Sequence, residues 1–171
     1  AASERYGFVR HAKLTASKDA KVSVLDGIQN VLPYGVPEGL QRGSSNLVDA
    51  YKKCELEEGN LGIFALSAII SDKAEPSEAL KANVVWSIGL DNPKVLLCAK
   101  QVAAFQTGGA VTTETDIKAE RGAYFVQSDF DLAAGETKDW MFATNLGQSI
   151  RSVVQLKEEL RKPEALKQDV L

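Results

Sequence analysis

Two carboxylates separated by a single residue, Asp129 and Asp131, are the pair whose spacing comes closest to acid–base chemistry. Residues 127–132 alternate apolar and polar side chains, so both carboxyl groups would lie on one face of a strand. Cleavage of a glycosidic bond needs an acid on one side of the bond and a carboxylate or phosphate on the other. Two carboxylates on one exposed face are more typical of a solvated edge or a calcium-tolerant surface, so we assign them no catalytic role.

The other reactive side chains lack partners. His11 is the only histidine, which removes Ser-His-Asp triads and multi-histidine metal sites, and we interpret it as structural or solvent-facing. Cys54 and Cys98 form no Cys-x-x-Cys motif. A disulfide between them stays open, but we favour two buried free thiols because a domain of this size needs no covalent staple. We therefore predict no catalytic residue, no metal site and no cofactor.

A stretch from residue 22 to residue 53 is the best candidate for binding. It begins as an alternating strand and is then interrupted repeatedly by Gly and Pro, so we interpret it as a long ordered loop, which in a compact domain is usually functional or a packing device. Asp26, beside Gly27, is expected to form an Asx-type turn. The candidate carbohydrate-contact residues are Gln29, Asn30, Tyr34, Gln41, Arg42, Asn46 and Asp49.

Two roles are open for these polar side chains. Amide, guanidinium and carboxylate groups can form paired hydrogen bonds with vicinal sugar hydroxyls, and the ring of Tyr34, between Pro33 and Gly35, offers a stacking face. The same groups can instead satisfy the backbone of a loop that packs on the sheet or on a neighbouring domain. We favour the packing role.

Length and charge exclude several classes of protein. The chain has 171 residues, enough for one domain, and a net charge of −3 without a basic stripe, which argues against nucleic-acid binding. The short basic pairs at 52–53 and 161–162 are flanked by acids and are expected on solvated faces. The longest apolar run, 61–70, is half the length that spans a bilayer, so no membrane partner is expected. Localisation is left unknown, with the cytoplasm favoured.

Residues 5–28 are predicted to form a β-hairpin around the polar turn SKDAK. Residues 45–56 fit both helical and strand spacing, and we prefer a strand that pairs with 61–71 across the turn signal EGNLG. A polar link, 71–81, follows.

The second half of the chain is predicted to be mostly strands. Trp140 and Phe142 should lie on the same side of the strand expected at 138–144. The expected elements are strands at 82–88, 95–98, 123–132 and 138–144, a short helix at 101–105, and a helix at 149–161 that Pro163 kinks or restarts. This order predicts an all-β fold, an antiparallel β-supersandwich with a C-terminal helix.

We treat 1–171 as a single β-sandwich domain, with 149–171 as a terminal or linker helix. The chain does not begin with Met and opens directly into a usable strand. We therefore expect it to be processed, or cut from a larger multidomain protein.

Several stretches resemble one family of enzymes. LDGIQNVLPYGV, SNLVDAYKK and FALSAIISDKAEPSEALKANVVWS are similar to the β-supersandwich domain that precedes the helical-toroid catalytic domain of cellobiose-phosphorylase-like enzymes, especially a bacterial group of large carbohydrate-active proteins. The ending, AYFVQSDFDLAAGETKDWMFATNLGQS, resembles the closing strands of that domain, where an L-x-x-G-E turn precedes an aromatic strand and a linking helix.

The resemblance implies a fold like that of galactose mutarotase and a partner, the helical toroid, on which the sandwich packs. In such enzymes the sandwich helps to close the sugar site and often supports dimerisation, so an oligosaccharide ligand and a homodimer stay open here. The catalytic acid and the phosphate-binding residues belong to the toroid, so no catalytic residue is carried over to this chain.

The function expected from these observations is a non-catalytic β-sandwich domain of a glycoside phosphorylase or glycoside hydrolase. The alternative is an autonomous carbohydrate-binding module; a mutarotase-like enzyme is disfavoured because it needs a general acid and a general base, and the chain has one histidine. A supporting domain should expose an apolar interface, whereas a module should present a polar surface with an aromatic platform.

Overall fold

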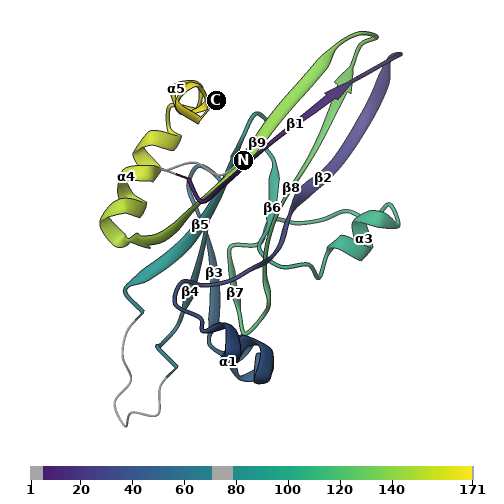
Figure 1. Cartoon of the computed structure of the whole chain (residues 1–171). Helices are drawn as coiled ribbons and strands as arrows, with labels where there is room; N and C mark the ends of the chain where they lie inside the picture. Colours follow the sequence, from purple (N-terminus) through teal and green to yellow (C-terminus); the bar gives the residue numbers. More distant parts are fainter. Residues whose placement is uncertain (1–5, 71–78, 171) are drawn as a thin grey trace.

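The computed structural model describes residues 6–170 apart from 71–78, and this part of the chain is built mainly of antiparallel strands (Figure 1). The strands are β1 (Phe8–Thr15), β2 (Ala20–Val31), β3 (Lys52–Glu57), β4 (Leu61–Leu66), β5 (Lys81–Ile88), β6 (Lys94–Leu96), β7 (Asp116–Lys118), β8 (Gly122–Leu132) and β9 (Thr137–Ser149). They form a six-stranded sheet in the order β1-β9-β5-β4-β3-β7 and a three-stranded sheet in the order β2-β8-β6. The predicted all-β sandwich is confirmed.

The predicted N-terminal hairpin is wrong in its pairing, although both of its strands exist. β1 pairs with β9 in the large sheet, whereas β2 pairs with β8 in the small one. The turn after β1 is tied to the turn after β8: the amide of Ala16 donates to the carbonyl of Glu136, and the amide of Gly135 donates to the carbonyl of Ala16. Together the four strands extend as one long arm (Figure 1). Which strand pairs with which is a long-range property that local alternation does not specify.

The predicted long loop is largely regular structure, which corrects the interpretation of residues 22–53. β2 continues to Val31, and Asp26 therefore lies within a strand rather than in a turn. Beyond it come two short helices, α1 (Glu38–Gly43) and α2 (Ser45–Ala50). Pro37 has the extended backbone of an N-cap residue, and Glu38 pairs with Arg42 one turn later, so α1 forms despite its two glycines.

The preferred hairpin of 45–56 with 61–71 is confirmed only in its central part. β3 pairs with β4 from Lys52 to Glu57, whereas residues 45–50 take the helical alternative. The polar link at 71–81 lies almost wholly outside the described residues.

The later elements agree with the sequence prediction. β5, β8 and β9 cover the expected strands, β6 covers only the first half of the strand expected at 95–98, and α3 (Val102–Gln106) is the expected short helix. α4 (Ile150–Leu160) starts after Ser149, whose hydroxyl accepts a hydrogen bond from the amide of Ser152. Pro163 begins a new helix, α5 (Pro163–Val170), so it restarts the helix.

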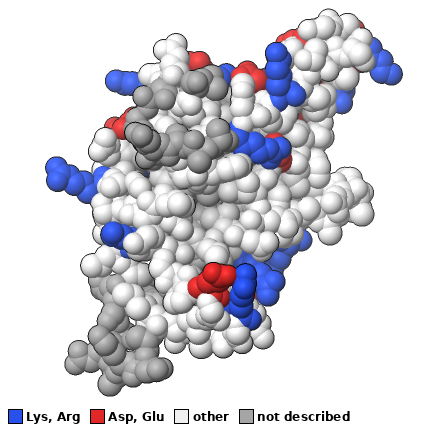
Figure 2. All heavy atoms as spheres, in the orientation of Figure 1, with Lys and Arg blue, Asp and Glu red and all other residues white. Residues whose placement is uncertain are grey.

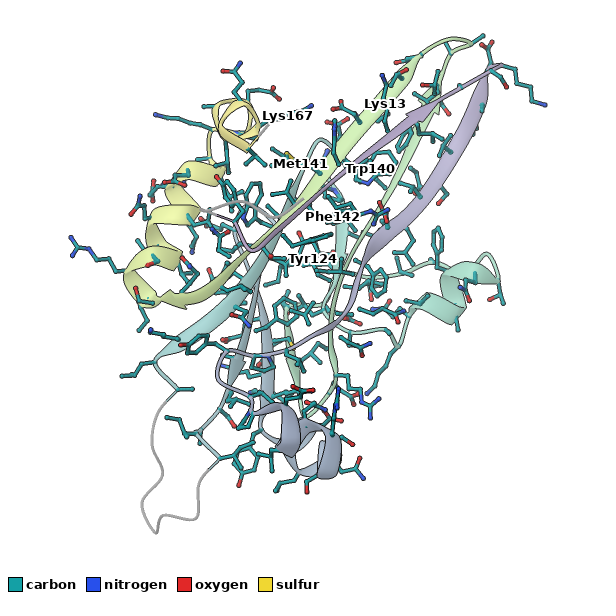
Figure 3. The ribbon with its side chains drawn as sticks, viewed as in Figure 1. Lys13, Tyr124, Trp140, Met141, Phe142 and Lys167 are labelled. Carbon is teal, nitrogen blue, oxygen red and sulfur yellow. The ribbon has the colours of Figure 1, made fainter. Side chains whose placement is uncertain are left out.

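The two faces of the large sheet have separate cores. Tyr124, Trp140 and Phe142 lie in the core between the sheets (Figure 3). Trp140 and Phe142 therefore share one side of β9, as predicted. The other face of the large sheet carries Trp86, which packs with Leu156 and Leu160 of α4 in a second core that covers this face with helices. The start of α4 lies beside a part of this face that the helices do not cover.

Candidate functional site

Three of the predicted contact residues, Asn30, Gln41 and Arg42, line a hollow of about 330 Å³ that we call the basic hollow. Ser45, Lys52 at the start of β3 and Arg121 just before β8 complete its polar lining. The residues come from the end of β2, from α1 and from the strand edges beside them, so segments far apart in the sequence meet here.

A β-bulge directs Asn30 toward the hollow. The pairing of β2 with β8 shifts register between Gln29 and Val31, which leaves Asn30 without a partner in the ladder. Its backbone has φ +57°, in the left-handed region that asparagine adopts more readily than most residues. Bulges re-aim side chains and are common beside binding sites.

Lys52 is the buried cation of the hollow, with a side chain that is 2% exposed. Its ammonium donates to Oδ1 of Asp49 at 2.7 Å and to Oε1 of Gln41 at 3.1 Å. Oδ2 of Asp49 accepts a hydrogen bond from Nε of Arg121 at 3.2 Å. Burial is the largest single influence on the pKa of Asp49 and raises it, but the hydrogen bonds from Lys52 and Arg121 outweigh burial and hold that pKa below its usual value.

The burial of Lys52 corrects the expectation that the basic pair 52–53 lies on a solvated face. Lys53 behaves as expected, since it is partly exposed and paired with Glu55. The side chain of Lys52 instead points to the same side of β3 as the buried Cys54. Alternation from Cys54 back to Lys52 was the signal for this orientation.

The remaining contact candidates lie apart from the basic hollow. Gln29 and Asn46 are exposed and are not among the described residues that line it. Tyr34 lies beside a second hollow, of about 390 Å³, that is mostly apolar and includes Leu66 and Ile69. The ammonium of Lys81 lies 5.3 Å from the centroid of the Tyr34 ring. A Cβ on Gly147 would be 3.0 Å from the edge of this ring, which therefore packs closely against the backbone of β9.

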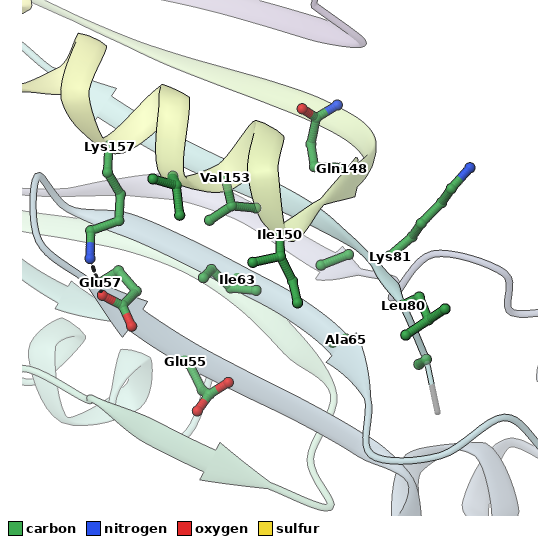
Figure 4. Close-up of a pocket in the computed structure, with 13 residues that line it drawn as sticks. Glu55, Glu57, Ile63, Ala65, Leu80, Lys81, Gln148, Ile150, Val153 and Lys157 are labelled. Atoms are coloured by element: carbon green, nitrogen blue, oxygen red, sulfur yellow. Dashed lines mark hydrogen bonds and ion pairs between the residues drawn. The ribbon is translucent and has the colours of Figure 1, made fainter. Parts of the chain in front are cut away.

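Sequence reasoning did not identify an apolar groove of about 330 Å³ between the start of α4 and the sheet. Its apolar lining consists of Ile63, Ala65, Ala79, Leu80, Ala82, Ile150, Val153 and Val154 (Figure 4). Leu80 is 69% exposed, Ile150 76% and Val154 55%. Charged side chains stand at its edges, where Lys157 pairs with Glu57 at 2.6 Å. Its signal in the sequence was the pair Ile150 and Val154, one turn apart on the expected helix.

The reactive side chains occupy structural positions. His11 lies 2.9 Å from Oδ2 of Asp139, which also accepts from Lys167 at 2.8 Å. Asp129 is exposed, and hydrogen bonds from Ser23 and Gln127 lower its pKa, the opposite of what a general acid needs.

Cys54 and Cys98 are free and buried, which confirms the predicted pair of thiols. Burial raises the pKa of Cys54 to about 12. Thiols of this kind are poor nucleophiles.

In the described part of the chain, no three His, Cys, Asp or Glu side chains gather closely enough to hold a metal ion. A search of the same residues for a helix long and apolar enough to cross a membrane also found none.

Comparison with known proteins gives no family assignment. No family model matches the chain, and no curated protein matches it. The resemblance to cellobiose-phosphorylase-like enzymes therefore rests on the sequence stretches quoted above.

Proposed function

We propose that this chain is a non-catalytic β-sandwich domain of a carbohydrate-active enzyme, a glycoside phosphorylase or glycoside hydrolase, and that it supports the enzyme by packing on a helical catalytic domain. The observation that carries the proposal is the apolar groove beside α4. Leu80, just before β5, and Ile150 and Val154 of α4 are exposed there and line the same groove. Contiguous apolar surface rimmed by charged residues is typical of a protein interface.

The energy available from covering this groove is substantial. Complete burial of one large aliphatic side chain contributes about 1.5–3 kcal/mol. Leu80, Ile150 and Val154 all retain most of their exposure, so a partner that covers them gains from each. The ion pair of Lys157 with Glu57 stands at the edge of the groove, where the polar rim of an interface belongs.

The alternative, an autonomous carbohydrate-binding module, requires an aromatic ring with a free face. Tyr34 is the candidate ring, and the ammonium of Lys81 already lies above it. The edge of the ring packs against Gly147. These contacts favour a packing role for Tyr34 and so favour the supporting domain over the module.

Calorimetric titration with neutral β-gluco-oligosaccharides, including cello-oligosaccharides, separates the two functions. We expect negligible heats from wild type and from Tyr34→Ala with Arg42→Ala, together with a lowered melting temperature in the variant, because Tyr34 packs against Lys81 and Gly147. Saturable heat in wild type that the variant loses would establish the module instead. Robust turnover of an oligosaccharide by the isolated chain would overturn both functions.

A further inference from the structure

We propose that the basic hollow at Asn30, Gln41, Arg42, Lys52 and Arg121 is a binding site for the oxyanion, carboxylate or phosphate, of a small ligand. The inference is independent of the apolar groove, which lies beside α4 and is lined by other residues.

The charge of the lining favours an anion. Lys52, Arg42 and Arg121 all line the hollow, and among its described lining residues none is a carboxylate. Asp49 lies behind the lining, where it holds Lys52 and Arg121 together. Figure 2 shows basic side chains beside acidic atoms in the lower part of the molecule, where Figure 1 places α1. Two carboxylates, Asp49 and the exposed Glu38, pair with these cations. The three cations therefore exceed the two carboxylates by one positive charge.

Both arginines keep donors available for a ligand. Arg121 uses Nε for Asp49, and its two terminal nitrogens take part in none of the hydrogen bonds or ion pairs recorded among the described residues. Arg42 uses Nη2 for Glu38, and both members of this pair are well exposed. An exposed pair contributes at most about 1 kcal/mol, so an oxyanion can displace Glu38. The planar guanidinium presents paired N–H groups that match two oxygens of a carboxylate or phosphate.

Lys52 and Asn30 give the hollow a preformed inner wall. The ammonium of Lys52 has three N–H donors, of which Asp49 and Gln41 accept two. Burying an ammonium until it is 2% exposed costs free energy unless an opposite charge lies near it and acceptors bind its protons. Asn30, held by the bulge in a left-handed conformation, adds an amide that can bind a hydroxyl next to the oxyanion.

A purely structural role for the same residues makes a different prediction. In that case Lys52 and Asp49 only fasten α2 to β3, and the two arginines are solvated surface cations. A structural cluster binds no added anion specifically, and removal of exposed arginines then changes no ligand affinity.

The experiment is calorimetric titration of the whole chain at low ionic strength with three probes: inorganic phosphate, glucuronate and neutral glucose. We expect saturable binding of at least one anion and none of glucose. Arg42→Gln and Arg121→Gln should each weaken that binding at least tenfold. Both side chains are exposed, so the variants should fold, and circular dichroism checks that they do. Arg151→Gln, an exposed arginine on α4, is the matched control and should bind as wild type does.

Each outcome decides one point. Tighter binding of phosphate than of glucuronate assigns the oxyanion to a phosphate source, and the reverse order assigns it to a sugar acid. Absence of saturable binding for both anions, equal affinity for glucose, or equal loss in Arg151→Gln would overturn the site. None of these results bears on whether the apolar groove is an interface.

Discussion

The indole Nε1 of Trp140 in β9 donates a hydrogen bond to Oδ2 of Asp26 in β2, at 2.8 Å, and this bond joins the two sheets. Oδ1 of the same carboxylate accepts from Nη1 of Arg10 in β1 at 2.6 Å. The side chain of Asp26 is 15% exposed, so the carboxylate serves both donors in a setting largely screened from water.

Asp26→Ala should therefore lower the free energy of unfolding by about 2–4 kcal/mol. A hydrogen bond to a charged group contributes about 1.5–3 kcal/mol, and loss of the carboxylate leaves the indole of Trp140 without its acceptor. Urea denaturation measures the change. Asp131→Ala is the control, since Asp131 is exposed on the same arm and should change stability by less than about 0.5 kcal/mol. Equal effects from both substitutions would contradict the role of Asp26.

Gly27→Ala should be severely destabilising. A Cβ at this position would lie 2.0 Å from the backbone oxygen of Tyr124, so β2 and β8 would have to separate. We expect a loss above about 3 kcal/mol, or failure to fold. The matched control is Gly39→Ala in α1, where a Cβ meets nothing within 4 Å and helix propensity improves by about 0.5–1 kcal/mol. A Gly27→Ala protein as stable as Gly39→Ala would show that this close approach is not real.

Cys54 and Cys98 should be unreactive in the folded protein and titrate as two thiols after denaturation without reductant. Burial raises the pKa of both, so little thiolate exists near pH 8 to attack a disulfide reagent. Ellman's reagent, added at pH 8 before and after denaturation, gives the measurement. No free thiol in the denatured chain would mean a disulfide, and rapid reaction in the folded chain would mean that the thiols are not buried.

Stability should fall as the pH rises above 9. The pKa of Cys54 is raised from 9.0 to about 12 in the folded chain, so between these values the unfolded chain loses this proton and the folded chain keeps it. Proton loss from the unfolded state favours unfolding. Denaturation of wild type and Cys54→Ala at pH 8 and pH 10.5 should show a smaller pH effect in the variant, and an identical effect would contradict the assignment.

The pKa of Asp49 should rise when Arg121 is replaced by Gln. Burial raises this pKa and is opposed by the two cationic donors, so removal of one donor leaves burial less opposed. NMR titration of the carboxyl carbon reports the shift directly. Arg42→Gln is the control, because Arg42 pairs with Glu38 and not with Asp49. An unchanged Asp49 pKa in Arg121→Gln would show that their hydrogen bond is absent in solution.

The parts of the fold that were predictable are those fixed by local patterns. β8 and β9 are long strands rich in apolar residues and are separated by the Gly135-Glu136 turn, and Ser149 marks the start of α4. The crossing of β1 and β2 into different sheets was not predictable, because the contact of Ala16 with Glu136 joins segments far apart in the chain. The alternation of apolar and polar residues within β1 or β2 is the same whichever strand each of them pairs with.

The candidate site was predictable in its residue types and not in its assembly. Asn30, Gln41 and Arg42 meet around one hollow, but the bulge that directs Asn30 toward it depends on the pairing of β2 with β8. Arg121 reaches the hollow from a distant segment that no local pattern connects to α1. The burial of Lys52 has a local signal, since the strand period places it on the buried side with Cys54.

Calorimetric titration of this chain with a separately produced helical-toroid catalytic domain measures whether the chain docks on such a domain, as we propose. We expect saturable binding by wild type, at least tenfold weaker binding by Ile150→Gln with Val154→Gln, and wild-type binding by the control Arg151→Gln, which lies on α4 outside the groove lining. Absence of binding by wild type, or equal binding by the groove variant and the control, would contradict the proposed docking.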